Sequence, residues 1–231
     1  MAQTKTDLKA DRKAKVKRRA SFLLVGLIIA IIVFTLLLHK PSYYNPPDFA
    51  YSKEVSPYLT HDLLPQLYNG VQQQEPFDLF VSQRGINDVI ARSIWPRESE
   101  GIRLSAPEVL FVPDRIVLLG TVAVGNVNFV VTAVVKVGLS REGLLNLRVA
   151  KVKIGAMNIT PLARVVARRA YQRRLAAKDI GTKDLRAQIA ASLLDDEPFD
   201  PVFEVEDKKV RAEKITITRG KLTIHLAMAN E

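Results

Sequence analysis

An uncharged apolar run at residues 20–38 is the feature that most limits what this chain can fold into. The run reads ASFLLVGLIIAIIVFTLLL, and its only polar members are Ser21 and Thr35. As an α-helix it would extend about 28 Å, close to the roughly 30 Å thickness of the hydrocarbon part of a bilayer. A buried core helix would carry a polar stripe, and a cleaved signal peptide would be followed by small residues, which residues 39–44 do not supply. The run therefore predicts an uncleaved membrane anchor.

The basic residues before this run predict its orientation. Residues 1–20 carry eight Lys or Arg and two Asp, and so supply more than half of the formal net charge of +10. Basic segments stay on the cytoplasmic side of membrane helices, which places the N-terminus in the cytoplasm and the rest of the chain outside it, on a cell membrane crossed once. The arm has no aromatic residues to stack on bases, so we expect the lipid bilayer, and not nucleic acid, as its partner.

The chain thus divides into four parts. They are a cytoplasmic basic arm, a transmembrane anchor, a linker and one extracytoplasmic domain, at residues 1–19, 20–38, 39–55 and 56–231. Prolines at positions 41, 46 and 47 predict an extended linker that holds the domain away from the bilayer. Tyr43 and Tyr44 follow the anchor closely, where we expect them to lie at the membrane interface.

The domain has the sequence pattern of an α+β fold. Residues rich in β-branched side chains, separated by turn residues, predict antiparallel strands at 102–111, 115–125, 127–138, 144–154, 202–206, 209–218 and 221–229, with a short strand at 76–81. Apolar residues at helical spacing predict helices at 56–74, 83–95, 161–178 and 182–194. We expect one curved antiparallel sheet packed against amphipathic helices on one face.

The sequence offers little material for catalysis or metal binding. It contains no Cys and three His, and it lacks Gly-rich phosphate loops and the G-x-S-x-G surroundings of a nucleophilic serine. We expect His61 and Asp62 to form a solvated surface pair. We expect the acidic residues 195–197, which Pro198 follows, to form a loop and not a calcium site. We therefore expect a protein that is not an enzyme, with no catalytic residue, metal site or cofactor.

The helix expected at 161–178 is unusually rich in arginine. Leu162, Val165 and Val166 share one face, which we expect to pack against the domain. The opposite face carries basic residues, among them Arg164, Arg168 and Arg174. This face is either a solvated exterior or a surface that binds the phosphate of lipid headgroups or of an anionic envelope polymer, because a guanidinium offers paired donors to phosphate.

Four segments occur together along the chain. They are the basic arm with its anchor, FDLFVS at 77–82 leading into a helix with Ile86, Asn87 and Ile90, VKIGAMNITP at 152–161, and RAEKITITRGKLTI at 211–224. In this combination the chain resembles the YpmS-like family of single-pass bacterial membrane proteins and, more loosely, the tubular lipid-binding superfamily. The resemblance covers most of residues 75–229 and implies a curled sheet wrapped against helices, forming an elongated apolar groove for acyl chains.

Two functions fit these observations. The first is a non-catalytic, membrane-anchored lipid-binding protein whose acyl chains would lie against six apolar residues: Ile86, Ile90, Phe129, Val131, Val135 and Val165. Its headgroup would be held by Arg164, Arg168 and Arg174. The same apolar residues also fit a solid core, and the sequence leaves that alternative open. The second function is a structural or assembly protein of the cell envelope that acts through contacts with a protein partner.

Overall fold

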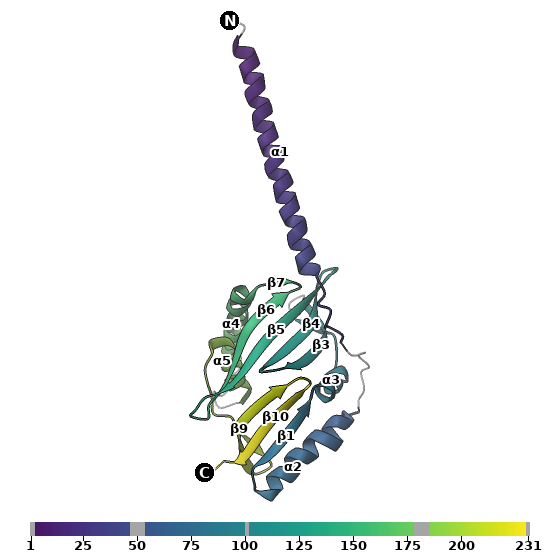
Figure 1. Cartoon of the computed structure of the whole chain (residues 1–231), viewed down its shortest axis with the longest axis vertical. Helices are drawn as coiled ribbons and strands as arrows, with labels where there is room; N and C mark the ends of the chain where they lie inside the picture. The colour runs from purple at the N-terminus through teal and green to yellow at the C-terminus, as the bar shows by residue number, and fades with distance from the viewer. Residues whose placement is uncertain (1–2, 47–53, 100–101, 178–184, 230–231) are drawn as a thin grey trace.

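The computed structural model describes residues 3–46, 54–99, 102–177 and 185–229. One long helix, α1 (Gln3–Leu38), extends away from a domain that contains all the other elements (Figure 1). Its apolar part, Ser21–Leu38, has a mean hydropathy of 3.0 and none of it is buried. This helix is compatible with a single-pass membrane anchor.

A six-stranded antiparallel sheet forms the half of the domain nearer to α1 (Figure 1). Its strand order is β2-β3-β4-β5-β6-β7, so strands adjacent in sequence are adjacent in the sheet. The strands are β2 (Arg97–Ser99), β3 (Ile102–Val112), β4 (Arg115–Val124), β5 (Val127–Leu139), β6 (Leu145–Ile154) and β7 (Met157–Asn158). The meander predicted from turn spacing is confirmed, and so is the α+β class.

A second, four-stranded sheet corrects the expectation of a single sheet. It has the order β1-β10-β9-β8, formed by β1 (Phe77–Ser82), β8 (Val202–Val205), β9 (Lys208–Thr218) and β10 (Lys221–Met228). The first strand pairs antiparallel with the last, with Phe77 opposite Leu226. Strand patterns predict where strands occur but not which distant strand each one joins, and so the separation into two sheets was not predicted.

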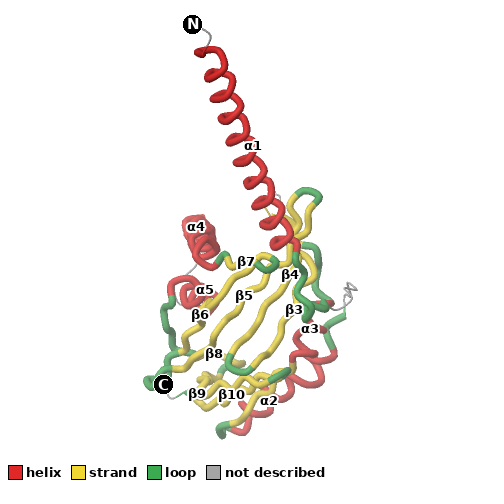
Figure 2. The backbone as a smooth tube through the Cα atoms, turned by 45° about the horizontal axis from the view of Figure 1, so that its top comes forward, coloured by secondary structure: helices red, strands yellow, loops and turns green. Residues whose placement is uncertain are grey.

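The four-stranded sheet packs against the half of the larger sheet that is remote from α1. Their shared core contains Leu79 and Val81 of β1, Phe111 of β3, and Ile217 and Leu226 of the final hairpin. The backbone joins the sheets as well, because the N–H of Gly220 donates to the carbonyl of Phe111 over 3.0 Å. The half of the six-stranded sheet that lies nearer to α1 extends beyond this contact (Figure 2).

The helices meet the six-stranded sheet at its two edges, and not across one face as expected. At the β3 edge lies α3 (Gln83–Ala91), which begins at the N-cap Ser82. The amide of Asn87 bonds to both backbone groups of Val109, accepting from the N–H over 2.8 Å and donating to the carbonyl over 2.9 Å. A strand edge presents unpaired backbone groups, so these side-chain bonds take the place of a further strand.

The β6 edge is closed by two further helices, α4 (Thr160–Ala177) and α5 (Leu185–Asp195). Ser192, which is fully buried, accepts a hydrogen bond from the N–H of Leu147 over 2.8 Å. From α4, Arg164 donates to the carbonyl of Val149 over 2.8 Å. The remaining helical segment, a π-helical turn at Tyr58–Leu63 followed by α2 (Leu64–Gln73), lies beside the four-stranded sheet (Figure 1).

Replacing Asn87 tests the importance of edge closure. Asn87→Ala removes both bonds to Val109, and since each such bond contributes about 0.5–1.5 kcal/mol, we expect the free energy of unfolding to fall by about 1–3 kcal/mol. The measurement is denaturant unfolding of the full chain in detergent, followed by fluorescence of Trp95, the single tryptophan, which bonds to Ile90 of α3. Asn128→Ala, at an exposed strand position, should change stability little; an equal loss in both variants would contradict the role of Asn87.

Candidate functional site

The C-terminal end of α1 is held directly by the domain. The carbonyl of Leu36, in the last turn of α1, accepts a hydrogen bond from the N–H of Ala156 over 2.8 Å. The adjacent Gly155 has φ +56°, and a Cβ there would overlap the carbonyl oxygens of Leu36 and Leu37. Carbonyls at the end of a helix lack partners within the helix, and here the β6–β7 turn supplies one. The position of the sheet relative to α1 is therefore set by backbone contact.

Residues 41–46, which we expected to act as part of a spacer, lie on the sheet instead. The Tyr44 side chain is only 4% exposed, where the sequence predicted an interfacial position, and it packs with Val117, Leu119 and Val130. Its hydroxyl lies 2.9 Å from the Thr121 hydroxyl. The expectation for Tyr44 is wrong because its ring, six residues after the end of α1, packs on an apolar face of the sheet. Tyr43 is exposed. Residues 47–53 of the predicted linker lie outside the described residues.

Glu108 helps to hold this segment against the sheet. Its carboxylate, on a largely buried side chain, accepts a hydrogen bond from the N–H of Asn45 over 3.0 Å. Burial raises the pKa of Glu108 above its ordinary value, and the bond from Asn45 only partly opposes that shift. Burial also raises the pKa of Tyr44.

The two faces of the six-stranded sheet are consequently unequal. We call the face covered by residues 41–46 the Tyr44 face, and the opposite one the open face. On the half of the open face nearer to α1, Gly120 is the only buried residue among those of the four central strands β3–β6 whose burial the structure describes. Leu118 is 40% exposed and Val124 51% exposed, and Ile102 and Leu104 are also exposed. The strand register places these residues in one apolar field: Ile102, Leu104, Leu118, Val122, Val124, Phe129, Val131, Ala133, Val152 and Ile154.

The predicted acyl-binding residues do not form a single lining. Phe129 and Val131 are on the open face, half-buried. Val135 follows on the same face but is buried, at 6% exposure, where the four-stranded sheet covers it. Ile86 packs against the shared core, and Ile90 is half-buried on α3 at the sheet edge. These three positions are therefore part of the folded core or its margin.

Val165 is separated from the others, because α4 is oriented opposite to our expectation. Leu162, Val165 and Val166 are 63%, 49% and 58% exposed, although we expected them to pack. The side toward the domain carries half-buried Ala163 and Ala167 together with Arg164 and Tyr171. Arg164 bonds to the β6 edge and the Tyr171 hydroxyl donates to the carbonyl of Ala187. Open backbone groups of the edge strand thus decide which side of α4 faces inward.

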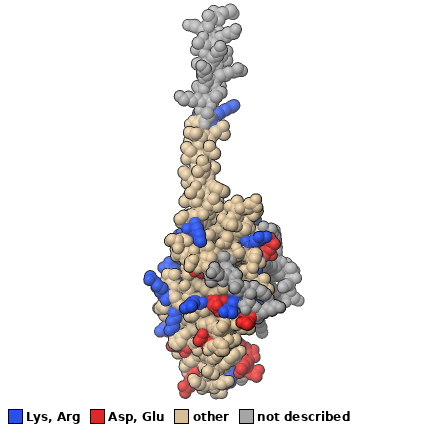
Figure 3. Space-filling view, turned by 90° about the vertical axis from the view of Figure 1, so that its right-hand side faces the viewer, with Lys and Arg blue, Asp and Glu red and all other residues tan. Residues whose placement is uncertain are grey.

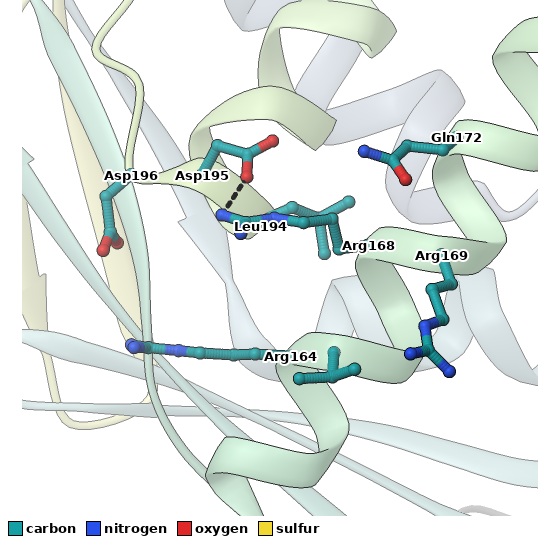
Figure 4. A pocket seen from close by; sticks show the side chains of 8 residues that line it. Arg164, Arg168, Arg169, Gln172, Leu194, Asp195 and Asp196 are labelled. Atoms are coloured by element: carbon teal, nitrogen blue, oxygen red, sulfur yellow. Dashed lines mark ion pairs between the residues drawn. The ribbon is translucent and has the colours of Figure 1, made fainter.

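A pocket of about 440 Å³ lies between α4 and the end of α5 (Figure 4). Its lining residues are Arg164, Val165, Arg168, Arg169, Gln172, Leu194, Asp195 and Asp196. Figure 4 shows the Arg168 guanidinium paired with the Asp195 carboxylate, while Arg164 reaches away from the pocket toward the strand. Two of the predicted headgroup residues, Arg164 and Arg168, are therefore engaged within the protein. The third, Arg174, has a side chain outside the described part of the structure.

Arg169 carries no ion pair to the residues drawn in Figure 4 and is exposed. It lies one turn after Val165 and Val166, on the outward side of α4. Arg169 was not among the residues that we expected to bind a headgroup, and the exposed Leu104 and Leu118 were not among those expected to contact acyl chains. The alternation of these two leucines with residues of the Tyr44 face is visible in the sequence of β3 and β4.

Other polar groups form pairs at the protein surface. His225 Nδ1 lies 2.7 Å from an Asp78 carboxylate oxygen across the β1–β10 pair, on the protein surface. Asp196, in the acidic loop, lies 3.8 Å from Arg148. Among the residues that the structure describes, no three His, Asp or Glu side chains are grouped so that they could hold a metal ion.

Comparisons with known protein families, with curated proteins and with solved structures gave no match to this chain.

Substituting Gly155 tests the contact between α1 and the domain. Gly155→Ala would place a Cβ against the Leu36 and Leu37 carbonyls, so we expect hydrogen exchange at Ala156 to accelerate at least tenfold as its bond to Leu36 breaks. Gly143→Ala is the matched control: φ is +78° there and a Cβ meets nothing, so only the cost of the left-handed backbone, about 1–2 kcal/mol, remains. Equal exchange of the Ala156 peptide in both variants would contradict the docking.

The raised pKa of Glu108 predicts a pH-dependent stability. The folded state favours the protonated carboxyl, so its stabilising contribution is complete below the ordinary pKa and is lost as the pH rises through the higher folded pKa. Glu108→Gln cannot ionise and still accepts from Asn45, so we expect it to gain stability relative to the parent chain between pH 4 and pH 7. The measurement is the free energy of unfolding at both pH values.

Glu142→Gln is the control of opposite sign. A hydrogen bond from the Ser140 hydroxyl lowers the pKa of Glu142, so this variant should lose stability relative to the parent over the same interval. A pH-independent difference for Glu108→Gln would show that the Glu108 carboxylate is not disfavoured in the folded chain.

Proposed function

We propose that this protein is a membrane-anchored, extracytoplasmic, non-catalytic lipid-binding protein that holds acyl chains on the open face of its six-stranded sheet. The observation that supports it is the uncovered apolar field at the end of the sheet where α1 leaves the domain. Exposed apolar side chains grouped in one area are typical of a binding surface. The resemblance to the YpmS-like family, and through it to tubular lipid-binding proteins, points to the same ligand class.

The dimensions of this field suit an acyl chain. From Leu118 to Val124 the strand advances by roughly 20 Å, and β3 to β6 together span roughly 14 Å. Each methylene removed from water contributes about 0.8 kcal/mol, so ten of them contribute about 8 kcal/mol before the costs of ordering. Apolar burial alone therefore gives useful affinity without any polar contact to the chain.

Docking of α1 supports a direct path between the bilayer and this field. If Ser21–Leu38 spans the membrane, the bond from Ala156 to Leu36 places the β6–β7 turn at the bilayer surface. The open face then begins where the hydrocarbon ends, and a lipid tail need cross little water to reach it. The basic arm at residues 1–19 favours the orientation in which the domain lies outside the cytoplasm.

The alternative function is a structural or assembly role in the cell envelope. The same open face would then receive an apolar segment of a protein partner instead of a lipid. Both functions use the same surface, so the experiment must identify the occupant chemically.

Site-specific photo-crosslinking of the full chain in its native membrane identifies that occupant. A benzophenone amino acid at Leu118 should form lipid adducts, visible by mass spectrometry, because this position lies in the open field. The same group at Val55 is the matched control, since Val55 is an exposed apolar residue outside the sheet. A companion variant, Leu118→Glu, should reduce co-purified lipid at least tenfold, whereas Val55→Glu should not.

The outcomes separate the two functions. Lipid adducts confined to position 118 support the proposal. Discrete protein adducts there, with no lipid, would favour the assembly role and overturn lipid binding. If the label at position 118 forms no adduct with lipid or with protein, the open face has no occupant.

A further inference from the structure

The first two turns of α4 present an apolar strip to the outside of the molecule. Leu162, Val165 and Val166 are each at least 49% exposed and lie at helical spacing on one side. Large apolar residues exposed singly are ordinary, but exposed apolar residues grouped on one side of a helix mark a candidate contact surface. Arg169 continues the same strip by one turn.

Charge narrows the choice of partner. The helix TPLARVVARRAYQRRLAA contains five arginines and no acidic residue, and its N-terminus carries the positive end of the helix dipole. A second copy of this helix would repel the first, so a symmetrical contact between two α4 strips is disfavoured. An anionic membrane surface accepts both kinds of side chain, because apolar side chains can enter the headgroup region while arginine is attracted to anionic lipid.

Position points to the same partner. Thr160, the first residue of α4, accepts a hydrogen bond from the N–H of Val152 over 2.8 Å, near the end of β6 that leads to the α1 contact. Figures 1 and 2 place α4 beside β6 and β7, at the end of the domain from which α1 leaves. Figure 3 draws the flank away from α4; on it Lys and Arg are mixed with Asp and Glu around the middle of the domain, and Asp and Glu lie mostly toward the end remote from α1.

We propose that α4 is a second membrane contact: its strip of Leu162, Val165 and Val166 inserts into the headgroup region of the bilayer that α1 spans, and Arg169 binds lipid phosphate. This inference rests on the membrane anchoring included in the proposed function, but not on lipid occupying the open face. Two contacts, α1 and α4, fix the tilt of the domain on the membrane. The open face then keeps a constant position relative to the bilayer.

The absence of cysteine from the sequence permits a direct test with single labels. Val166→Cys in the full chain is labelled with an environment-sensitive fluorophore and reconstituted into vesicles of phosphatidylcholine and phosphatidylglycerol that contain a shallow spin-labelled lipid. We expect the label at 166 to be quenched at least threefold more than a label at Asp207→Cys. Asp207 is exposed in the β8–β9 turn, two residues before Lys209, whose carbonyl accepts from the N–H of Ala229 near the C-terminus; Figure 1 shows the C-terminus at the end of the domain remote from α1.

Gly26→Cys, at an open position within the apolar run, separates failure of this inference from failure of the anchor. Quenching at 26 by a deep spin label, with none at 166 above the level at 207, would overturn the α4 contact and leave the anchor standing. No quenching at 26 would overturn both. Quenching at 26 and 166 without lipid crosslinks at Leu118 would support the α4 contact while removing the acyl-binding role.

The lipid composition tests the role of charge. In vesicles of phosphatidylcholine alone, we expect quenching at 166 to fall by at least half, because Arg169 then loses its net anionic surroundings. Arg169→Gln in the mixed vesicles should give the same decrease, and Arg115→Gln, at an exposed strand position remote from α4, should not. Equal quenching of the parent chain and of Arg169→Gln in the mixed vesicles would overturn the assignment of Arg169 to phosphate.

Discussion

The unpaired backbone groups along the two edges of the six-stranded sheet are the constraint on which the arrangement of this domain depends. An edge strand exposes N–H and carbonyl groups that must be satisfied or covered. Here α3 satisfies one edge through Asn87, and α4 and α5 satisfy the other through Arg164 and Ser192. Helices used in this way cannot also cover the faces of the sheet.

The faces are therefore covered by other parts of the chain, and only in part. Residues 41–46 cover one face through Tyr44, and the four-stranded sheet covers the remote half of the other. What stays uncovered is an apolar area next to the end of α1. The docking of Leu36 on the β6–β7 turn gives this area a defined position relative to α1, because the contact is made by backbone atoms.

The orientation of α4 shows how polar requirements can prevail over apolar periodicity. The apolar strip at Leu162, Val165 and Val166 would bury well, but the sheet edge needs a donor at the carbonyl of Val149, and Arg164 supplies it from the opposite side of the helix. The bond to Val149 does not act alone, because the same side of α4 also packs Ala163 and Ala167 and lets the Tyr171 hydroxyl donate to the carbonyl of Ala187. The strip thereby becomes available to a partner outside the domain, which we take to be the bilayer.

Several features could be predicted from the sequence because they depend on local order alone. The apolar run, the four strands of the meander and the α+β class follow from hydrophobic period and turn residues, each within a short stretch of chain. Alternation along β5 also puts Phe129, Val131 and Val135 on one side of the strand, and the strand register agrees with this.

Only the tertiary structure decided the rest, because it depends on pairs of residues far apart in the chain. The pairing of β1 with β10 divides the strands into two sheets; Val135 is buried and Ile86 packs against the shared core, while Leu118 stays exposed. Tyr44 contacts the sheet and Ala156 bonds to Leu36, so the described part of the predicted linker, residues 41–46, does not act as a spacer. Local periodicity determines which residues share one side of a helix or strand. Which side faces the interior depends on the neighbouring segment that packs against that helix or strand in the folded chain.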